Sequence, residues 1–326
     1  MLELHLKNPN ELELRSVDPL PQPQGDEVKI KLIYAGICGS DLGVYRGKLK
    51  HATYPLRPGH ELLGTVIEAG ENAQYGLGTR VVILPNTFCG ECDYCQAGKT
   101  NICPQKKSLG VNQDGGFSEE FIISSKFVLP IPEDLSDKKA VLIEPFAVVV
   151  HALKKVNITK GTTVAIVGSG NEGMLAAALA YHLGAQVTAL DINPKKLELT
   201  KSLGDIRVAF PQDVEGETFD VVIEAAGTKA SVEQAVQLTR PGGAVVLIGL
   251  APEVNLSAMH IVRNEISIFG SIIYNFPTDY LQTVEYLRSP DFNVDPIVSK
   301  IMPLTSYQEA YDTALSGDFG KVLFKF

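Results

Sequence analysis

Four of the five cysteines lie together in one short segment. Cys89, Cys92, Cys95 and Cys103 follow the pattern C-x2-C-x2-C-x7-C. Four thiolates so close in sequence match the tetrahedral coordination of Zn²⁺, which takes sulfur ligands at about 2.3 Å. Such a closed site has no position for a substrate, so we predict a structural zinc. The alternatives are disulfides, which a reducing compartment disfavours, and an iron–sulfur cluster, although nothing else in the chain suggests electron transfer.

The fifth cysteine belongs to a second set of possible ligands. Cys38 lies in the sequence GICGSD, and His60 and Glu61 lie in the sequence PGHELLG. Taken alone, a cysteine is more often a small buried hydrophobic residue, and a His-Glu pair is usually just hydrogen-bonded. Cys, His and Glu ligands with one open position, however, describe a catalytic zinc site. We therefore treat these three residues as candidate catalytic ligands.

A glycine-rich turn supplies the third chemical motif. Gly168, Gly170 and Gly173 form the pattern G-x-G-x-x-G, and Asp191 follows at the end of the next predicted strand. In a dinucleotide site the first glycine makes the turn, the second lets the backbone approach the pyrophosphate, and the third allows close helix packing. Asp191 would accept hydrogen bonds from the adenosine ribose and repel a 2′-phosphate. The pattern favours NAD over NADP; the alternative is an ordinary turn with a surface aspartate.

Two charged residues complete the candidate cofactor-binding set. Glu172 places a carboxylate in the first turn of the helix after the glycines, where it suits the helix dipole but would repel a phosphate. We therefore expect its side chain to point away from the pyrophosphate. Lys196 lies on the helix that follows Asp191.

The elements that must position these residues change in character along the chain. Up to about residue 130, alternating segments such as 28–34 and frequent Pro and Gly predict short strands and tight turns. From there, predicted strands at 164–167, 187–190, 221–223, 244–248 and 266–269 alternate with helices at 174–183 and 194–203. This alternation predicts an α/β fold with a doubly wound parallel sheet. We place a first domain at 1–146, with 272–326 returning to it, and a nucleotide-binding domain at 147–271.

Composition excludes several other classes of protein. The 326 residues are 45% hydrophobic and 21% charged, which is typical of globular domains. The net charge of −9 leaves no basic surface for nucleic acid, and no apolar run is long enough to span a membrane. The first residues do not have the pattern of a signal peptide. We expect a cytoplasmic protein that binds neither nucleic acid nor membrane.

Taken in order, these motifs resemble the zinc-dependent medium-chain dehydrogenases/reductases of the alcohol dehydrogenase superfamily. The sequences GICGSD and PGHELLG, the four-cysteine segment, the Glu144-Pro145-Phe146 sequence and the turn at Gly168 all match. The match is nearest to the polyol, sorbitol and threonine dehydrogenase branch. The resemblance implies a GroES-like β-rich catalytic domain that holds two zinc ions, joined to a Rossmann domain that binds NAD.

The resemblance also assigns roles to individual residues. Cys38 and His60 would bind the catalytic zinc, and Glu61 would bind it or lie close enough to swing onto it. Glu144 stands where simple alcohol dehydrogenases often have a second cysteine, and it would bind the zinc or hold its water. Ser40 would take the hydroxyl proton from the substrate.

One position departs from the family pattern. Many relatives have a histidine two residues after the aspartate of the Cys-Gly-Ser-Asp sequence, and this chain has Gly43. A proton relay that ends on that histidine is therefore absent. His51 or water could take its place. Asp41 would orient His60 through its second ring nitrogen, and the alternative for Asp41 is an exposed N-cap role.

The predicted activity is hydride transfer between NAD and a secondary alcohol of a polyol, sugar or vicinal diol. A threonine-type dehydrogenase acting on a 3-hydroxy amino acid is the alternative within the enzyme class. A non-catalytic nucleotide-binding redox sensor is the alternative outside it, although a sensor does not need an open metal site. The apolar segment 266–273 at the end of the Rossmann sheet could extend that sheet across a two-fold axis. We expect a homodimer or homotetramer.

Overall fold

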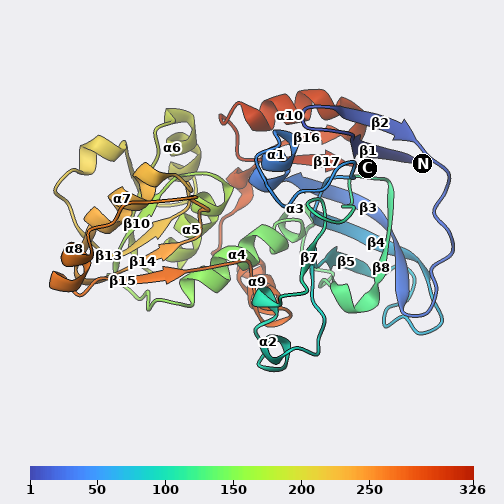
Figure 1. The fold of residues 1–326 in the computed structure, drawn as a ribbon, viewed down its shortest axis with the longest axis horizontal. Helices are drawn as coiled ribbons and strands as arrows, with labels where there is room; N and C mark the ends of the chain where they lie inside the picture. Colours follow the sequence, from blue (N-terminus) through green and yellow to red (C-terminus); the bar gives the residue numbers. More distant parts are fainter. The chain divides into compact units, whose positions relative to one another are not determined.

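The computed structural model describes residues 1–326, which form two compact units. The first contains Met1–Glu144, Asn275–Arg288 and Val298–Phe326, and the second contains Pro145–Tyr274 and Ser289–Ile297. Figure 1 shows the elements of both units coloured along the chain. No helix has the length and apolar character needed to cross a lipid bilayer.

The first unit is rich in β-structure, as the dense Pro and Gly predict. Its strands are β1 (Leu2–Leu6), β2 (Leu12–Ser16), β3 (Glu27–Ile37), β4 (Glu61–Ala69), β5 (Arg80–Ile83), β6 (Asn86–Thr87), β7 (Lys107–Ser108), β8 (Glu120–Ser124), β9 (Val128–Pro130), β16 (Val298–Pro303) and β17 (Lys321–Lys325). Its helices are α1 (Gly39–Tyr45), α2 (Asp93–Gln96), α3 (Asp137–Ala140), α9 (Thr278–Arg288) and α10 (Tyr307–Leu315), while α4 (Ile143–Leu153) runs from this unit into the second.

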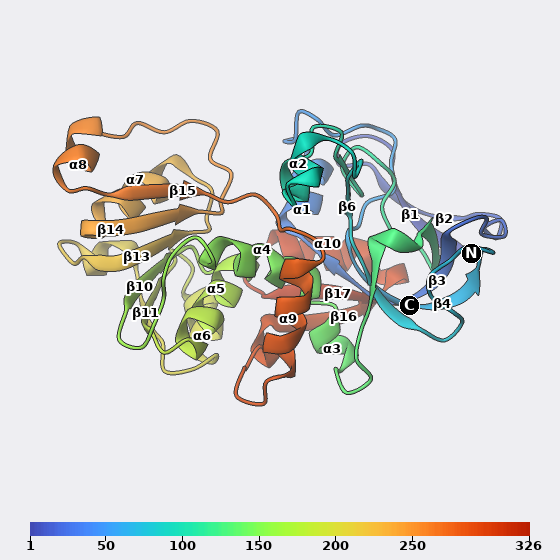
Figure 2. The same cartoon turned by 90° about the horizontal axis from the view of Figure 1, so that it is seen from below.

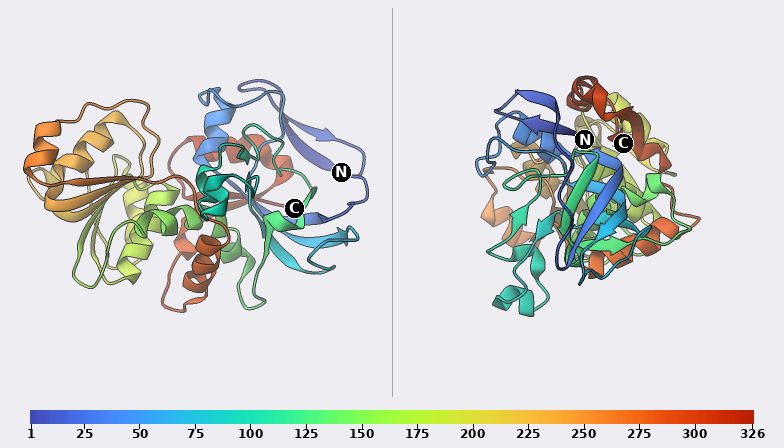
Figure 3. Two further views of the ribbon diagram at one scale, coloured as in Figure 1. Left: turned by 60° about the horizontal axis from the view of Figure 1, so that its bottom comes forward. Right: turned by 90° about the vertical axis from the view of Figure 1, so that its right-hand side faces the viewer.

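A seven-stranded sheet forms the framework of this unit. Its order is β16-β17-β3-β4-β5-β9, with β8 also pairing with β3. The right-hand view of Figure 3 shows blue, cyan and green strands of this unit side by side. The long strand β3 is the centre, because it pairs antiparallel with β4, β8 and β17. The C-terminal strand β17 therefore lies beside residues that are almost three hundred positions earlier in sequence. The hydrophobic core of this unit includes the fully buried residues Ile30, Phe117 and Phe324.

The second unit has the predicted alternation of strands and helices. Its strands are β10 (Thr163–Val167), β11 (Gln186–Leu190), β12 (Arg207–Ala209), β13 (Phe219–Glu224), β14 (Thr239–Leu247) and β15 (Ser267–Gly270), and its helices are α5 (Asn171–His182), α6 (Pro194–Lys201), α7 (Lys229–Gln237) and α8 (Ala258–Arg263). The sheet is parallel throughout, in the order β12-β11-β10-β13-β14-β15. The helices α5 and α6 pack on one face and α7 on the other (Figure 2). This is the Rossmann order, and it confirms the predicted fold class.

Two details differ from the sequence prediction. We predicted a strand at 244–248, but β14 already begins at Thr239, before Pro241–Gly243. These residues instead form an irregularity inside β14, where the pairing shifts between Phe219↔Thr239 and Val221↔Ala244. The last strand also ends at Gly270, short of the predicted apolar segment to residue 273, and Ile273 has a positive φ of 38°.

The segment 289–297 belongs to the second unit, although we had assigned 272–326 as a whole to the first domain. Its side chains explain the difference. Phe292 is 2% exposed and stacks on Phe146, with ring centroids 5.0 Å apart. Asn293 donates a hydrogen bond to the Ser202 carbonyl (3.3 Å). The chain therefore crosses back to the second unit before it forms β16 and β17.

Candidate functional site

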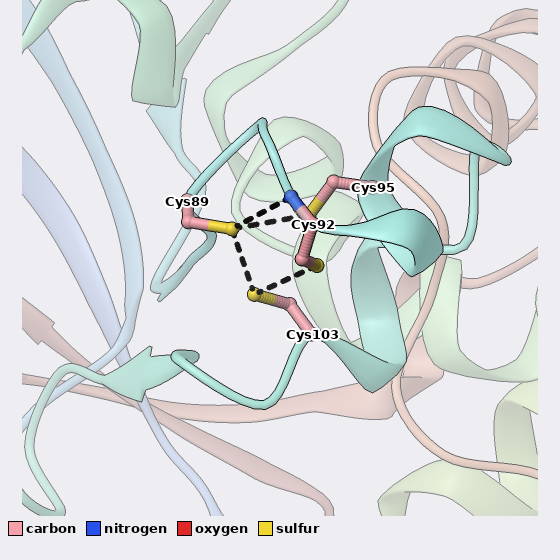
Figure 4. Close-up of side chains that lie close together, drawn as sticks. All are labelled: Cys89, Cys92, Cys95 and Cys103. Carbon is pink, nitrogen blue, oxygen red and sulfur yellow. Dashed lines mark hydrogen bonds between the residues drawn. The ribbon is translucent and has the colours of Figure 1, made fainter.

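The four cysteines of the predicted structural zinc site converge in the segment between β6 and β7 (Figure 4). The Sγ atoms of Cys89 and Cys103 are 3.6 Å apart, those of Cys89 and Cys95 are 3.9 Å apart, and those of Cys92 and Cys103 are 4.0 Å apart. Bonds of about 2.3 Å to a tetrahedral zinc place sulfurs about 3.8 Å from one another. The four side chains thus have the spacing that zinc requires.

The surroundings of these cysteines also suit a metal. Backbone N–H groups of Glu91 and Cys92 lower the pKa of Cys89 to about 6, whereas burial raises the pKa of Cys95 to about 12. A metal ion among the four sulfurs would favour the thiolate form of each cysteine. The helix α2, which includes Cys95, has no buried residue. Because this segment lacks a hydrophobic core of its own, a metal would supply its main tertiary restraint.

A second set of candidate ligands lies where β3, α1 and β4 meet. Cys38 is the N-cap of α1, directly after β3, and Glu61 is the first residue of β4. Pairing of Gly36 with Glu61 brings these chain segments together. The ligand atoms of Cys38, His60 and Glu61 all lie within 4.8 Å of one another. The donor set is thiolate, imidazole and carboxylate, which is a combination that zinc accepts.

His60 is held between two polar side chains. Its Nδ1 lies 3.3 Å from Asp41 Oδ1, and its Nε2 lies 3.2 Å from Ser40 Oγ. A proton on Nδ1, facing the carboxylate, leaves the Nε2 lone pair available for a metal. Burial alone would lower the pKa of His60, but Asp41 and the Cys38 thiol outweigh it, and the pKa is well above its ordinary value. Binding of a metal at Nε2 would therefore release the proton from that nitrogen.

Asp41 forms hydrogen bonds with both chain segments that carry the candidate ligands, the one at Cys38 and the one at His60. It is 1% exposed, its Oδ2 accepts a hydrogen bond from the Cys38 backbone N–H (2.9 Å), and its Oδ1 accepts one from the Gly59 N–H (3.1 Å). Gly59 has a φ of 100°, and a Cβ there would lie 2.1 Å from the Phe117 ring. One carboxylate therefore fixes the backbone beside Cys38 and beside His60, in addition to facing the imidazole.

Glu61 forms an ion pair that sequence reasoning missed. Lys321 Nζ donates to Glu61 Oε1, and both side chains are fully buried. Gly36, on the strand between them, leaves the space for the carboxylate, since a Cβ there would lie 2.0 Å from Glu61 Oε2. No local pattern in the sequence could have paired residues 260 positions apart.

The structure does not bring Glu144 into the same set. Glu144 is buried, 6% exposed, in the first turn of α4. Its carboxylate is not among the ligand atoms that lie within 4.8 Å of one another around Cys38. Its role toward zinc therefore remains a hypothesis from the family resemblance.

The second unit contains a crevice at the carboxyl ends of its strands, with a cavity of about 790 Å³. Gly168 and Asp191 line it, together with the segment 211–217 and residues at the start of α7, including Thr228 and Ser231. Asp191 also holds the local backbone, because its Oδ2 accepts from the Ser169 N–H (2.7 Å) and its Oδ1 from the Asn193 N–H (2.8 Å). The walls at 211–217 and at α7 were not predicted.

The glycine-rich turn has the geometry that a pyrophosphate requires. A Cβ at Gly173 would lie 1.8 Å from the Gly168 carbonyl oxygen, so only glycine allows α5 to pack this closely. Gly170 is the N-cap of α5, and a Cβ there would face open space. Glu172 lies in the first turn of α5 and Lys196 on α6, and neither lines the cavity.

Unsatisfied polar atoms gather at the same end of the sheet. Asn171 Oδ1 at the start of α5 and Ser271 Oγ just after β15 are buried without a hydrogen-bond partner. Buried polar groups normally have partners, and groups without one point to a ligand or a functional role. The turn, the crevice and these atoms together fit a dinucleotide.

Comparison with known proteins agrees with this geometry. Residues 24–133 match the family described as alcohol dehydrogenase GroES-like domain, and residues 173–289 match the family described as zinc-binding dehydrogenase. The chain is 32% identical over 321 residues to sorbitol dehydrogenase of Halalkalibacterium halodurans, covering 94% of this chain and 93% of that protein. It is 32% identical over 324 residues to L-threonine 3-dehydrogenase of Coxiella burnetii, covering 94% and 93%.

Solved structures show the same similarity. One, described as a short chain alcohol dehydrogenase from E. coli CFT073 complexed with NADH, has a TM-score of 0.92 and 28% identity and covers 100% of this chain and 99% of that one. Another, described as a zinc-binding dehydrogenase from Sinorhizobium meliloti 1021 bound to NADP, has a TM-score of 0.92 and 29% identity and covers 100% and 99%.

Proposed function

The chain belongs to the zinc-binding dehydrogenases of the alcohol dehydrogenase superfamily, and we propose that it oxidises a secondary alcohol of a polyol, sugar or vicinal diol with NAD. The observation that supports this most directly is the convergence of Cys38, His60 and Glu61 in one unit. Three protein ligands with an open position are typical of catalytic rather than structural zinc. The polyol class follows from relatives such as the sorbitol dehydrogenase.

The side chains around this set have distinct tasks. A bound zinc would supply Lewis-acid chemistry, which lowers the pKa of a coordinated hydroxyl group. Ser40 lies beside His60 Nε2 and would accept the substrate hydroxyl proton and pass it on. Asp41 keeps the imidazole in one tautomer and orientation. Lys321 restrains Glu61 through their buried ion pair.

The crevice in the second unit favours NAD over NADP. Asp191, Glu215 and Glu217 line it, and all three are acidic. Glu217 is paired with Arg207 (2.7 Å), which therefore is not a free cation for a 2′-phosphate. Because both NADH and NADP occur in similar structures, cofactor choice requires a direct test.

A threonine-type activity is the second candidate, since a threonine dehydrogenase is as similar as the sorbitol enzyme. An amino acid substrate needs a cation for its carboxylate. Lys321, the buried lysine next to the ligand set, already pairs with Glu61. The polyol activity therefore has the better support.

We also propose that the chain forms a homo-oligomer through β15. This strand is an edge of the six-stranded sheet, so one side of its backbone is unpaired within the chain. Phe269 on β15 is 37% exposed, and Val262 and Met259 on α8 are 74% and 64% exposed. Light scattering should show a dimer or tetramer that Phe269→Glu shifts to smaller species, whereas Leu77→Glu, in the first unit and also exposed, leaves the assembly unchanged.

The decisive experiment is an activity screen that follows reduction of the nicotinamide cofactor. Polyols, sugars, vicinal diols and threonine are each offered with NAD and with NADP. We expect turnover of at least one polyol, sugar or diol with NAD, and loss of turnover after dialysis against a chelator, restored by Zn²⁺. Turnover of threonine alone would support the second candidate. Activity that survives complete zinc removal would contradict the zinc mechanism.

A further inference from the structure

The loop that leads into the candidate ligand His60 is bound along its backbone to a second loop of the first unit. Three N–H groups of the loop 115–117 donate hydrogen bonds of 2.6 to 2.9 Å to the carbonyl oxygens of the loop 57–59. The pairs are Gly115 with Arg57, Phe117 with Pro58 and Gly116 with Gly59. Every carbonyl of the loop 57–59 thus has its partner in the loop 115–117, so the backbone before His60 follows that loop.

The two loops are also packed too closely to shift independently. A Cβ at Gly115 would lie 2.2 Å from the Gly59 carbonyl oxygen, and a Cβ at Gly59 would lie 2.1 Å from the Phe117 ring. Gly59 has a positive φ of 100°, a conformation that residues other than glycine rarely adopt. The turn just before His60 therefore depends on its contact with the loop 115–117.

The side chain of Arg57 joins both loops to the strand β1. Its Nε donates a hydrogen bond to the Gly115 carbonyl oxygen (2.5 Å), and its Nη1 pairs with Glu3 Oε2 (2.7 Å). Its backbone N–H donates to Asp114 Oδ1 (2.8 Å). The side chain is 14% exposed, and its Cζ lies 5.8 Å from the centroid of the Phe121 ring. The planar guanidinium holds two partners in fixed directions, which the ammonium group of a lysine cannot do.

Glu3 on β1 is the anchor for this arginine. It is 8% exposed, and its second oxygen, Oε1, accepts a hydrogen bond from Arg15 (2.7 Å). Burial would raise the pKa of Glu3, but the hydrogen bonds and charges of Arg15 and Arg57 lower it below its ordinary value. Arg15 lies on β2, and its other contacts are with His5 and Glu13. One carboxylate thus binds two arginines, of which Arg57 belongs to the loop before the candidate zinc ligand.

We propose that Arg57 is a positioning residue for the candidate catalytic zinc site, where it keeps His60 in place by holding the two loops together. It acts through the backbone and is not itself a ligand, and the inference rests on the zinc site of the proposed function. The Gly59 N–H also donates to Asp41 Oδ1 (3.1 Å), so a shift of this loop would disturb the carboxylate that faces the imidazole. An apolar residue in place of Arg57 would remove the donor to the Gly115 carbonyl.

The test measures how tightly each of the two proposed sites holds zinc. Full-length protein is dialysed against chelator buffers that set a series of free Zn²⁺ concentrations, and the bound zinc per chain is counted by elemental analysis. The binding step that is absent from Cys38→Ser belongs to the candidate catalytic site. We expect Arg57→Met to weaken this step about tenfold, as loss of groups that orient metal ligands does, while the other step changes less than about twofold.

Two further variants separate the contacts of Arg57. Arg57→Lys keeps a cation beside Glu3 but not the planar fork that also reaches Gly115, so we expect it to weaken the same step about threefold or more. Arg15→Met removes the other arginine from the same carboxylate and is the matched control. It should leave both steps within about twofold of the wild type, because Arg15 does not contact the loop before His60.

Each outcome decides for or against this role. An unchanged Cys38-dependent step in Arg57→Met would overturn the proposal, and so would equal weakening of both steps, which indicates a general structural effect. Arg15→Met with the same effect as Arg57→Met would assign the effect to the charge of Glu3 instead. If Arg57→Met does not fold, Arg57→Lys decides, since wild-type affinity in that variant contradicts the role of the guanidinium. A wild type without a Cys38-dependent step would contradict the proposed function itself.

Discussion

At the scale of single residues, the buried pair Glu61–Lys321 explains how a carboxylate is kept beside the candidate zinc ligands. Both side chains are fully buried, and the glycine at position 36 makes room for them. A buried ion pair adds little net stability, because desolvation offsets the attraction, but removing one partner leaves a costly uncompensated charge. The pair therefore serves to hold Glu61 in place.

Lys321→Met tests this interpretation. We expect it to lower the free energy of unfolding of the metal-free protein by about 3–5 kcal/mol, because Glu61 is left buried without its partner. Lys325→Met, on the exposed end of the same strand, should change stability by less than about 0.5 kcal/mol. Urea unfolding measures both. Equal effects of the two variants would show that the buried pair has no special role.

Asp220 provides a pH-dependent contact in the second unit. Its Oδ2 accepts hydrogen bonds from the Thr163 backbone N–H and hydroxyl, both at 2.7 Å, and its Oδ1 accepts one from Arg240 (2.5 Å). Hydrogen bonds from Thr163, and then from Arg240, lower the pKa of Asp220 to about 2. The folded-state pKa is below the ordinary 3.8, so the stabilisation is complete above that value and is lost as the pH falls toward 2.

We expect Asp220→Asn to cost about 1–2 kcal/mol at neutral pH, allowing for the partial exposure of this side chain. The difference from the wild type should narrow as the pH falls below about 4, because the wild type then loses its carboxylate as well. Denaturant unfolding across this pH range checks the prediction. A difference that does not change with pH would assign the effect to packing.

At the scale of elements, two glycines near the turn between β10 and α5 have different roles. Gly173 is needed for packing, since a Cβ would collide with the Gly168 carbonyl. Gly170 has an ordinary φ of −67° and open space beside it, so the fold itself does not require glycine there. The open space is where the helix N-terminus would approach a pyrophosphate.

Gly170→Ala and Gly173→Ala should therefore behave differently. We expect Gly170→Ala to keep the wild-type melting temperature but to weaken NADH binding about tenfold or more, because the methyl group lies between backbone and phosphate. Gly173→Ala should lower both stability and binding. Thermal unfolding and a binding titration measure the two effects. If Gly170→Ala binds NADH with unchanged affinity, the pyrophosphate does not bind beside Gly170.

At the scale of the whole molecule, the five cysteines divide into two proposed metal sites, and we expect loss of each metal to have different consequences. Cys103 belongs to the four-sulfur cluster of a segment whose α-helix, α2, has no buried residue, whereas Cys38 belongs to the candidate catalytic set beside a large sheet with its own core. Loss of the first metal should unfold its segment. Loss of the second should leave the β-sheet intact.

We expect two zinc ions per wild-type chain by elemental analysis and one in each of Cys103→Ser and Cys38→Ser. Cys103→Ser should lower the free energy of unfolding by about 3 kcal/mol or more, because structural zinc contributes directly to folding. Cys38→Ser should abolish turnover while its thermal stability stays near that of the wild type. A stable, active Cys103→Ser protein would refute a structural role for the four-cysteine cluster.

The sequence alone was sufficient wherever function depends on near neighbours in the chain. Ligand spacing in the four-cysteine segment, the glycine pattern after β10 and the strand–helix alternation are local, because a turn or a tetrahedral site is built from residues a few positions apart. The family and the fold class followed from them and are confirmed. The residue roles at the zinc and cofactor sites remain predictions.

Only the tertiary structure decided the contacts between distant segments. Lys321 reaches Glu61 because β17 and β4 flank β3, and Ser289–Ile297 joins the second unit because Phe292 packs on Phe146. The Glu224 carbonyl meets the N–H groups of Ile248 and Gly249 at the end of β14 only in the folded sheet. Strand pairing and side-chain packing between residues hundreds of positions apart leave no periodic pattern in the sequence. The free energy of such a contact depends on which residues become neighbours in the folded protein, and their order along the chain does not specify this.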